Sequence, residues 1–335
     1  MRIFENHSLK AYNTFRIDCK AAFFAVVTSV SELRKILAEP DFLKLPKLFL
    51  GGGSNILLCR DFQGLVILID LKGISDLGNG MIKVQAGENW HEFVLWSIHN
   101  GYNGIENLSL IPGNIGAAPM QNIGAYGVEL KDVFIELEAF HIDSEEIHSF
   151  DRESCHFAYR ESVFKNIHKG KYIILSVTLQ LRKDGIVNTT YGPIVDVLDQ
   201  MSIYNPSPKD VSEAVISIRS SKLPDPKEIG NSGSFFKNPV ILKSHFEDIK
   251  KEYADVPSYL VNDREVKVPA AWLIEKAGWK GKRIGNYGVH DKQALVLVNY
   301  GGANGKDIYK LAQDIQSSVK DKFGILLQME VNVIK

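Results

Sequence analysis

The amino-acid sequence predicts an α+β protein built from about two domains. Its 335 residues are 45% apolar, which is enough for more than one hydrophobic core. Residues 220–227 carry Pro224 and Pro226 and mark the expected boundary between the domains. A doubly wound dinucleotide-binding fold is disfavoured, because its glycine fingerprint requires glycine where Ile56 stands and a helix where the sequence predicts another strand.

The first two-thirds of the chain are expected to be rich in strands, with few helices. Ser29 and Glu32 have the spacing of a capping box and predict a helix that ends before Pro40. Asn89 is expected to cap a second helix, which stops at Gly101. Apolar segments between turn signals predict strands at 23–27, 47–50, 65–69, 81–86, 133–142, 147–150 and 172–181.

The last third has the pattern of a compact α/β unit. Ser207 is expected to cap a helix that leads to the domain boundary. Beyond the boundary the sequence predicts a helix at 270–276, a strand at 294–299, a long amphipathic helix and a final strand. Glu330 projects from the polar side of that final strand, where a solvated carboxylate is the common case. The apolar face of the strand consists of Leu327, Met329, Val331 and Val333, and the amphipathic helix carries Ile308, Leu311, Ile315 and Val319 at helical spacing.

Composition and charge exclude several classes of function. The chain has 39 basic and 40 acidic residues, so it lacks the basic excess that nucleic acid or an anionic membrane calls for. Cys19, Cys59 and Cys155 are far apart, which argues against a disulfide framework and a zinc ribbon. The nine histidines form no H-E-x-x-H pattern, and no metal site is expected. With no apolar run of signal-peptide or membrane-spanning length, the protein is expected to be cytoplasmic.

Residues 111–127 (IPGNIGAAPMQNIGAYG) are apolar and glycine-rich, and they follow neither a helical nor a strand period. A flexible linker would be polar, so this stretch is expected to be buried or half-buried irregular backbone. Such backbone needs partners for its N–H and C=O groups, and the phosphates and ring heteroatoms of a cofactor would supply them. A tight crossover between two packed layers is the alternative. We interpret the stretch as the wall of a cofactor site.

A second glycine-rich segment, residues 50–55 (LGGGSN), follows the predicted strand at 47–50. Consecutive glycines after a strand can present a nest of backbone N–H groups to a phosphate. The alternative is a plain glycine turn in a hairpin-like connection.

Two polar side chains stand out among aromatic neighbours. Arg160 lies between Tyr159 and Glu161 and suits two-point recognition of a carboxylate or phosphate, although an exposed arginine paired with a nearby acid is the commoner case. Ser234 follows Gly233 and precedes two phenylalanines, without the G-x-S-x-G frame of a serine hydrolase. Loop structure alone is the alternative explanation for Ser234.

Seven short motifs follow one another in a specific order along the chain: Asn13-Thr14-Phe15, residues 50–55, residues 111–127, Tyr159-Arg160-Glu161-Ser162, Lys222-Leu223-Pro224, residues 233–239 and Met329-Glu330-Val331. Each motif is short, but seven in the right order are very specific. Together they resemble the flavoprotein family of UDP-N-acetylenolpyruvoylglucosamine reductases (UDP-N-acetylmuramate dehydrogenases) of bacterial cell-wall synthesis. The resemblance covers nearly the whole chain.

The resemblance implies an FAD-binding region of the vanillyl-alcohol-oxidase-like (PCMH) type over residues 1–221, with subdomains of about 1–70 and 71–221. An α/β substrate-binding domain would follow over 222–335, and its C-terminal strand would return to the active site. Tyr191-Gly192-Pro193 and the long segment between Pro239 and Ala270 match the subtype with an extra tyrosine loop and an inserted unit. FAD would be held without a covalent link by Gly51, Gly52, Gly53, Ser54, Asn55, Pro112, Gly113, Asn114, Gly116, Ala117, Gln121, Asn122, Gly124, Ala125 and Tyr126.

The implied reaction reduces an enolpyruvyl UDP-sugar with NADPH as co-substrate. NADPH would reduce the flavin, and flavin N5 would deliver hydride to the terminal carbon of the enol ether. Arg160 would hold the substrate carboxylate and spread the developing charge, and Glu330 beside it would have a raised pKa and act protonated. Ser234 would protonate the carbanion as general acid. Substrate contacts are implied for Tyr159, Tyr191, Lys222 and Asn238 in a protein expected to be a monomer.

Departures from the family pattern are few. Gln328-Met329-Glu330 stands where relatives often have proline before the glutamate, which leaves the strand geometry at Glu330 open. Two other functions compete with the reductase. A flavin oxidase of the same fold would lack the combination of Ser234, Arg160 and Glu330. A non-catalytic nucleotide-sugar-binding module would have no need for two glycine-rich flavin loops.

Overall fold

The computed structural model describes residues 1–335, and its internal contacts group into two units. The first unit comprises residues 1–7, 21–52 and 62–221, and the second comprises residues 8–20, 53–61 and 222–335. The two short segments 8–20 and 53–61 therefore group with the C-terminal third, unlike in the division into 1–221 and 222–335 drawn from the sequence. The further division of the first region near residue 70 stays a prediction. Each unit is described by itself below.

One sheet of the first unit is built around three parallel strands. β5 (Phe62–Ile69) is parallel to both β2 (Lys20–Val27) and β3 (Lys47–Leu50), and β1 (Ile3–Ser8) lies at the edge in the order β1-β2-β5-β3. Helix α1 (Val30–Leu37) begins at Ser29, whose hydroxyl accepts the N–H of Glu32 as the capping spacing predicts. Leu33 and Ile36 of this helix are fully buried in the same core as the strand residues Ala25 and Ile67.

A five-stranded antiparallel sheet forms the other part of the first unit. Its order is β11-β10-β12-β7-β6. Helix α2 (Trp90–His99) is capped by Asn89 and buries Trp90, Phe93 and Val94 in the core shared with this sheet. The strands are β6 (Ile74–Asp76), β7 (Met81–Gln85), β10 (Phe134–His141), β11 (Ile147–Asp151) and β12 (Tyr172–Gln180).

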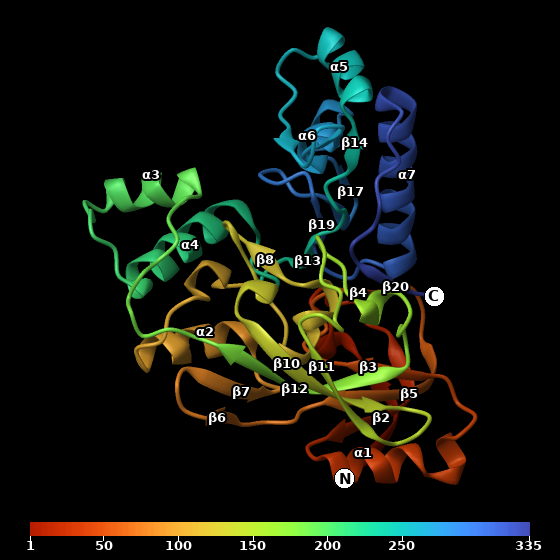
Figure 1. Ribbon diagram of the computed structural model, residues 1–335. Helices are drawn as coiled ribbons and strands as arrows, with labels where there is room; N and C mark the ends of the chain where they lie inside the picture. Colours follow the sequence, from red (N-terminus) through yellow and green to blue (C-terminus); the bar gives the residue numbers. More distant parts are fainter. The chain divides into compact units, whose positions relative to one another are not determined.

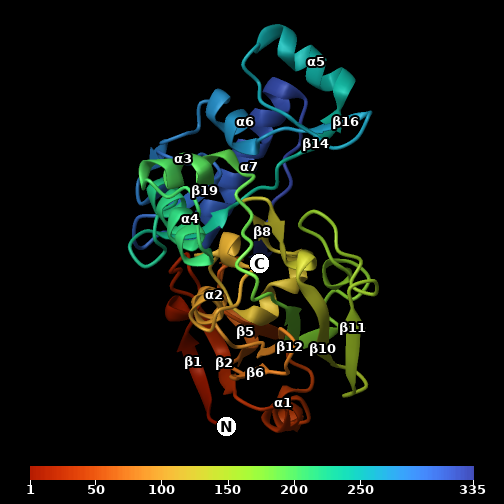
Figure 2. The same cartoon turned by 60° about the vertical axis from the view of Figure 1, so that its left-hand side comes forward.

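Two helices close the first unit in sequence. α3 (Gly192–Gln200) and α4 (Pro208–Lys222) lie side by side in both views (Figures 1 and 2) and share a small core around Ile194 and Val215. The sequence predicted α4 from its Ser207 cap, but α3 was not predicted. Its first residues, Gly192 and Pro193, read as a loop, although proline at the first turn of a helix is favourable.

The second unit is organised around the sheet β13-β19-β18-β17, to which the long helix α7 packs through β18 and β19 (Figure 1). A second, three-stranded sheet has the order β14-β16-β15, and β20 pairs in parallel with β4. The bounds are β4 (Ile56–Leu58), β13 (Gly230–Ser234), β14 (Val240–Leu242), α5 (Lys243–Glu252), β15 (Tyr259–Leu260), β16 (Glu265–Lys267), α6 (Ala270–Lys276), β17 (Arg283–Ile284), β18 (Tyr287–Val289), β19 (Val296–Asn299), α7 (Gly305–Phe323) and β20 (Asn332–Ile334).

The final strand is shorter than predicted. Regular pairing begins only at Asn332, so Glu330 precedes β20. The physical reason is that the chain changes partners here: Met329 forms an isolated bridge with Phe236, whereas Asn332 donates its N–H to the carbonyl of Asn55. The predicted alternation of burial persists in part, since Leu327 and Val331 are buried and Gln328 is exposed.

The apolar stretch 111–127 contains no long element. It forms the 3₁₀ turns η4 (Ile115–Ala117) and η5 (Pro119–Gln121) and begins a hairpin of β8 (Gly124–Ala125) and β9 (Val128–Glu129). Irregular backbone is thus confirmed here. The remaining 3₁₀ turns are η1 (Lys10–Tyr12), η2 (Pro40–Phe42), η3 (Glu106–Leu108), η6 (Leu130–Asp132) and η7 (Val163–Lys165). No helix of the protein has both the length and the apolarity needed to cross a bilayer.

Candidate active site

The first unit brings part of the two glycine-rich segments together. A Cβ atom at Gly52 would lie 2.9 Å from Asn114 Oδ1 and 2.9 Å from Gly113 Cα, so only glycine permits this approach. A Cβ at Gly51 would meet only Asn114 Cβ, at an ordinary 3.7 Å. Two segments about sixty residues apart in sequence, both predicted to hold FAD, therefore form one continuous surface.

Main-chain hydrogen bonds fix the stretch after Pro112 along residues 86–90. The N–H of Trp90 donates to the carbonyl of Gly113 at 3.0 Å, and the N–H of Ile115 donates to Glu88 at 2.8 Å. Asn114 Nδ2 donates to the carbonyl of Gly87 at 3.1 Å. Gly52, Pro112 and Ala117 remain exposed. A rigid, glycine-lined and mostly apolar surface of this kind fits a flat cofactor that needs close approach of the backbone.

Arg160 is joined to the other half of the same stretch. Its Nη2 donates to the carbonyl of Gly124 at 2.6 Å, and its Nη1 donates to Asn122 at 3.4 Å. The residue stands at the tip of a tight turn closed by Ala158 and Glu161, where its φ is +55°, a strained conformation for arginine. The Ser162 hydroxyl donates to the carbonyl of Met120 at 2.7 Å and holds this turn against residues 120–124. Hydrogen bonds thus join the predicted carboxylate-binding arginine directly to the predicted flavin-binding stretch.

Asn122 has a structural part in that assembly. It is fully buried with φ +44°, and its Nδ2 donates to Glu129 at 3.0 Å and to the carbonyl of Ala158 at 3.2 Å. Its Oδ1 accepts the N–H of Lys131. The side-chain amide of Asn122 is thus used in hydrogen bonds within the protein. Asn122 therefore contributes to a cofactor site mainly by fixing the backbone around it.

The one tyrosine of the stretch, Tyr126, meets the segment that carries Tyr191. The rings of Tyr126 and Tyr191 are 5.3 Å apart in an edge-to-face arrangement, and Tyr191 is 40% exposed. Tyr126 is hydrogen-bonded to Arg219 of α4, and burial raises the pKa of its hydroxyl. Tyr191 therefore has a defined neighbour on the predicted cofactor wall.

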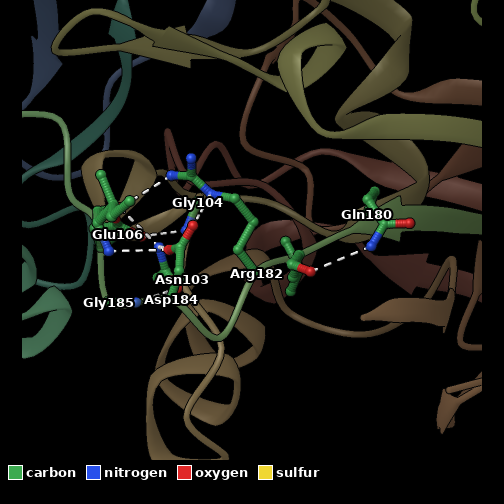
Figure 3. A network of polar contacts seen from close by, with 9 residues as sticks. Asn103, Gly104, Glu106, Gln180, Arg182, Asp184 and Gly185 are labelled. Atoms are coloured by element: carbon green, nitrogen blue, oxygen red, sulfur yellow. Dashed lines mark hydrogen bonds and ion pairs between the residues drawn. The ribbon is translucent and has the colours of Figure 1, made fainter. Parts of the chain in front are cut away.

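A polar network fixes the start of the segment that leads from β12 to Tyr191 (Figure 3). Asn103 and Arg182 exchange main-chain hydrogen bonds of 2.8 and 3.0 Å. Asn103 Nδ2 donates to Asp184 Oδ1 at 3.0 Å and to the carbonyl of Ile186 at 2.7 Å, which Arg182 Nη2 also reaches at 3.0 Å. Nearby, the buried Glu106 accepts the N–H of Gly104 at 2.6 Å, and burial raises the pKa of its carboxyl.

Asn107 extends this anchoring toward Tyr191. The side chain is 1% exposed, and its Nδ2 donates to two carbonyl oxygens, those of Tyr126 and Asn188, each at 2.9 Å. One buried amide thus connects the predicted cofactor stretch with the segment just before Tyr191.

In the second unit, the N-terminal motif Asn13-Thr14-Phe15 joins the rest of the glycine loop to the strand of Ser234. Thr14 donates its N–H to the carbonyl of Gly53 at 3.1 Å and accepts the N–H of Asn231 at 3.0 Å. Gly53 has φ +61°, and a Cβ there would lie 2.0 Å from the carbonyl oxygen of Tyr12. Asn13 is buried and donates to Leu9 and Ile17, which stabilises the turn. This motif therefore has a structural role: it holds the glycine loop and strand β13 in place.

The second unit also places the other two predicted catalytic residues close together. Ser234 ends β13, and the carbonyl of the next residue, Phe235, accepts the N–H of Glu330 at 2.8 Å. Asn55 Nδ2 donates to the carbonyl of Glu330 at 3.3 Å. Asn55, Phe235 and Glu330 belong to motifs that are far apart in the sequence, and hydrogen bonds bring them together here.

The remaining predicted substrate residues have varied surroundings. Asn238 Oδ1 accepts the N–H of Ala270 at 2.9 Å and so supports the start of α6. Lys222 is the last residue of α4 and is exposed. The ring of Tyr159 lies 5.5 Å from the guanidinium carbon of Arg160. Their contact with a substrate stays a prediction.

Sequence reasoning missed the buried polar side chains of Asn107 and Glu106 and the partly buried Arg219. A signal for Arg219 was present, because it continues the spacing of Val211 and Val215, both of which are buried on α4. A charge on an apolar helical face indicates a functional or paired group. For Asn107 and Glu106 the sequence offered no comparable pattern, since both lie in the single short 3₁₀ turn η3.

Two family models match the chain. Residues 21–150 match the model described as "FAD binding domain", and residues 225–334 match "UDP-N-acetylenolpyruvoylglucosamine reductase, C-terminal domain". The second match covers Ser234, Asn238 and Glu330, and the first covers both glycine-rich segments.

Relatives are similar over the full length. The UDP-N-acetylenolpyruvoylglucosamine reductase of Flavobacterium johnsoniae is 53% identical over 339 aligned residues, with 100% of both chains covered. The protein of the same name from Amoebophilus asiaticus is 50% identical, again with 100% of both chains covered. The crystal structure of UDP-N-acetylenolpyruvylglucosamine reductase from Thermus caldophilus superposes with a TM-score of 0.70 over 100% of both chains at 24% identity, a likeness that concerns the fold.

Proposed function

Because the chain belongs to the UDP-N-acetylenolpyruvoylglucosamine reductase family, we propose that it reduces UDP-N-acetylglucosamine enolpyruvate to UDP-N-acetylmuramate with NADPH. The protein is an FAD-dependent oxidoreductase of peptidoglycan precursor synthesis. When bound, FAD supplies hydride transfer between the nicotinamide and the enol ether. The cytoplasmic location expected from the sequence agrees with a nucleotide-sugar substrate.

One structural observation carries the proposal. Asn55 of the glycine loop donates to the carbonyl of Glu330, and the N–H of Glu330 donates to Phe235, the neighbour of Ser234. A proton donor acts only within hydrogen-bond reach of the reacting atom, so it must be held on rigid elements. The hydrogen-bonded segments around Ser234 and Glu330 provide such a support beside a loop proposed to hold FAD.

Arg160 is proposed to bind the substrate carboxylate. Hydride addition to the terminal carbon leaves an electron pair beside that carboxylate, and a guanidinium can stabilise the charge as it spreads. The bonds from Nη1 and Nη2 to Asn122 and Gly124 fix the plane of the guanidinium before substrate binds. Pre-organisation of this kind lowers the reorganisation required in the transition state.

Ser234 is proposed to protonate the carbanion, and Glu330 is proposed to act beside the carboxylate in its protonated form. A hydroxyl is a weak acid, but a carbanion is a strong enough base to accept its proton. Tyr159, Tyr191, Lys222 and Asn238 are proposed to contact the nucleotide sugar. For Tyr191 the edge-to-face contact with Tyr126 supports this role, because it holds the ring at the edge of the cofactor wall.

The decisive experiment is anaerobic consumption of NADPH by the purified yellow protein, with and without the enolpyruvyl UDP-sugar. Sustained consumption that depends on the sugar nucleotide is expected. Consumption of one flavin equivalent, with turnover resuming only when oxygen is admitted, would instead indicate an oxidase. A colourless protein that binds the sugar nucleotide would indicate a binding module.

A further inference from the structure

Arg219 carries a positive charge, and the groups that act electrostatically on it include no carboxylate. It lies on α4 at helical spacing from Val211 and Val215, which are fully buried. Its Nε is sealed from solvent and has no hydrogen-bond partner, and its guanidinium is hydrogen-bonded to Tyr126. Burial lowers the pKa of Arg219, but an arginine stays charged in proteins, so the site contains a partly buried cation.

The groups that act electrostatically on Arg219 do not neutralise its positive charge. They are Tyr126, an uncharged phenol whose pKa is raised further by burial, and Arg160, a second guanidinium. Two like charges near each other in a partly buried site repel, and a buried polar N–H without a partner destabilises the protein. Proteins compensate for such an arrangement with an anion.

His91 shows that further positive charge is kept out of this site. Its Nδ1 accepts the main-chain N–H of Leu110 at 3.0 Å, so Nδ1 carries no proton and the ring is neutral. Burial and the charge of Arg219 both lower the pKa of His91. The positive charge is thus concentrated on Arg219 and Arg160, the two side chains that present planar, multiple N–H donors.

We propose that Arg219 is a second anion-binding residue of the active site, which pairs through its guanidinium with a planar, delocalised anion on the bound ligand. The location follows from Tyr126, which belongs to the predicted FAD-binding stretch and packs against Tyr191. Within the proposed function, two groups have this chemistry: the N1–C2=O edge of FAD in its reduced state, and the carboxylate of the enolpyruvyl substrate. Only the second of these groups, the substrate carboxylate, makes the inference depend on the proposed function.

The test compares Arg219→Gln, which removes the charge, with Arg219→Lys, which keeps it without the planar fork. Lys209→Gln is the matched control, because Lys209 lies on the same helix and its side chain is 74% exposed in a pair with Glu213. For each protein three quantities are measured: the FAD midpoint potential, the dissociation constant of the enolpyruvyl UDP-sugar from the flavin absorbance change, and FAD affinity of the apoprotein.

If reduced FAD is the anion, Arg219→Gln lowers the midpoint potential, and a tenfold preferential loss of affinity for the reduced cofactor corresponds to about 30 mV. If the substrate carboxylate is the anion, the potential is unchanged and the dissociation constant of the sugar nucleotide rises at least tenfold. Arg219→Lys should recover part of either effect, and it also serves if Arg219→Gln does not fold.

The inference is overturned if both the potential and the sugar-nucleotide affinity of the Arg219 variants equal those of the Lys209→Gln control. Failure of the proposed function looks different: the unaltered protein would then bind FAD but would not turn over the enolpyruvyl UDP-sugar, and the potential measurement would still test Arg219.

Discussion

The main-chain N–H of Glu330 donates to the carbonyl oxygen of Phe235 at 2.8 Å. Because Phe235 follows Ser234 directly, this bond joins the backbone segments that carry the proposed proton donor and the proposed acid. Neither residue depends on a flexible loop for its position relative to the other. The pair can therefore be tested by substitutions that change a functional group and leave the backbone in place.

Ser234→Ala is expected to block protonation while leaving the reductive half of the reaction intact. Loss of a general acid slows its step by about 10²–10⁴-fold. Anaerobic stopped-flow absorbance should show flavin bleaching by NADPH at the normal rate and reoxidation by the enolpyruvyl UDP-sugar slowed by that factor. Fast reoxidation in the variant would move the proton donor to another residue. Ser232→Ala, two residues earlier on β13, is the control for a lost hydroxyl on the same strand.

Gly52→Ala is expected to destabilise the protein, whereas Gly51→Ala is not. The new Cβ at residue 52 would lie 2.9 Å from both Asn114 Oδ1 and Gly113 Cα, and the one at residue 51 would have an ordinary contact of 3.7 Å. Overpacking of this kind lowers the free energy of unfolding by about 1–3 kcal/mol. Urea unfolding of the FAD-free proteins measures the difference without interference from the cofactor. Equal unfolding midpoints in the two variants would contradict the close approach of the two glycine-rich segments.

Asn107→Ala is expected to loosen the segment before Tyr191. The substitution leaves the carbonyls of Tyr126 and Asn188 without their buried donor, which destabilises the local structure by about 1–3 kcal/mol. The KM for the UDP-sugar should rise more than kcat falls, and limited proteolysis should cut within 183–191. Asn100→Ala removes an exposed amide that bonds only to Trp96 and should leave both readouts unchanged. An unaltered KM together with unaltered proteolysis would rule out the anchoring role.

Stability is expected to fall as the pH is lowered below neutrality, in part through His91. Burial lowers the pKa of His91 in the folded protein, whereas the unfolded chain takes up a proton near its ordinary value of about 6.5. Below that pH the unfolded state binds more protons than the folded state, so acid favours unfolding until the folded-state pKa is reached. Urea midpoints at pH 7.5 and 5.5 should differ less in His91→Gln than in the unaltered protein. A pH dependence that His91→Gln leaves unchanged would show that this histidine makes no contribution.

Local signals in the sequence correctly predicted the helices whose ends depend on nearby residues. The caps at Ser29 and Asn89 act as their spacing predicts, because an N-cap side chain interacts only with the next three residues. Helix α6 has its predicted bounds. Such features depend on neighbours in sequence, which a single chain reveals.

Features that depend on distant partners were not predictable in the same way. Glu330 lies outside a regular strand, because its segment changes partners between Phe236 and Asn55. Helix α3 escaped prediction since Gly192 and Pro193 read as loop residues, and packing of Ile194 against α4 stabilises the helix. The partly buried cation at Arg219 becomes visible only when its surroundings are known. The resemblance to a family gave the candidate catalytic residues, and the structure shows the hydrogen bonds that hold their segments in place.

The grouping of residues 8–20 and 53–61 with the C-terminal third has a consequence for synthesis on the ribosome. These segments emerge first, yet their partners, such as Asn231 for Thr14 and Glu330 for Asn55, are translated more than two hundred residues later. Until then both early segments lack native partners, and pairing across such sequence distances is slow. The unit can therefore close only after the segment that carries Glu330 has been translated and is accessible. Newborn chains stalled before Glu330 should remain susceptible to aggregation and proteolysis at their N-terminal segments.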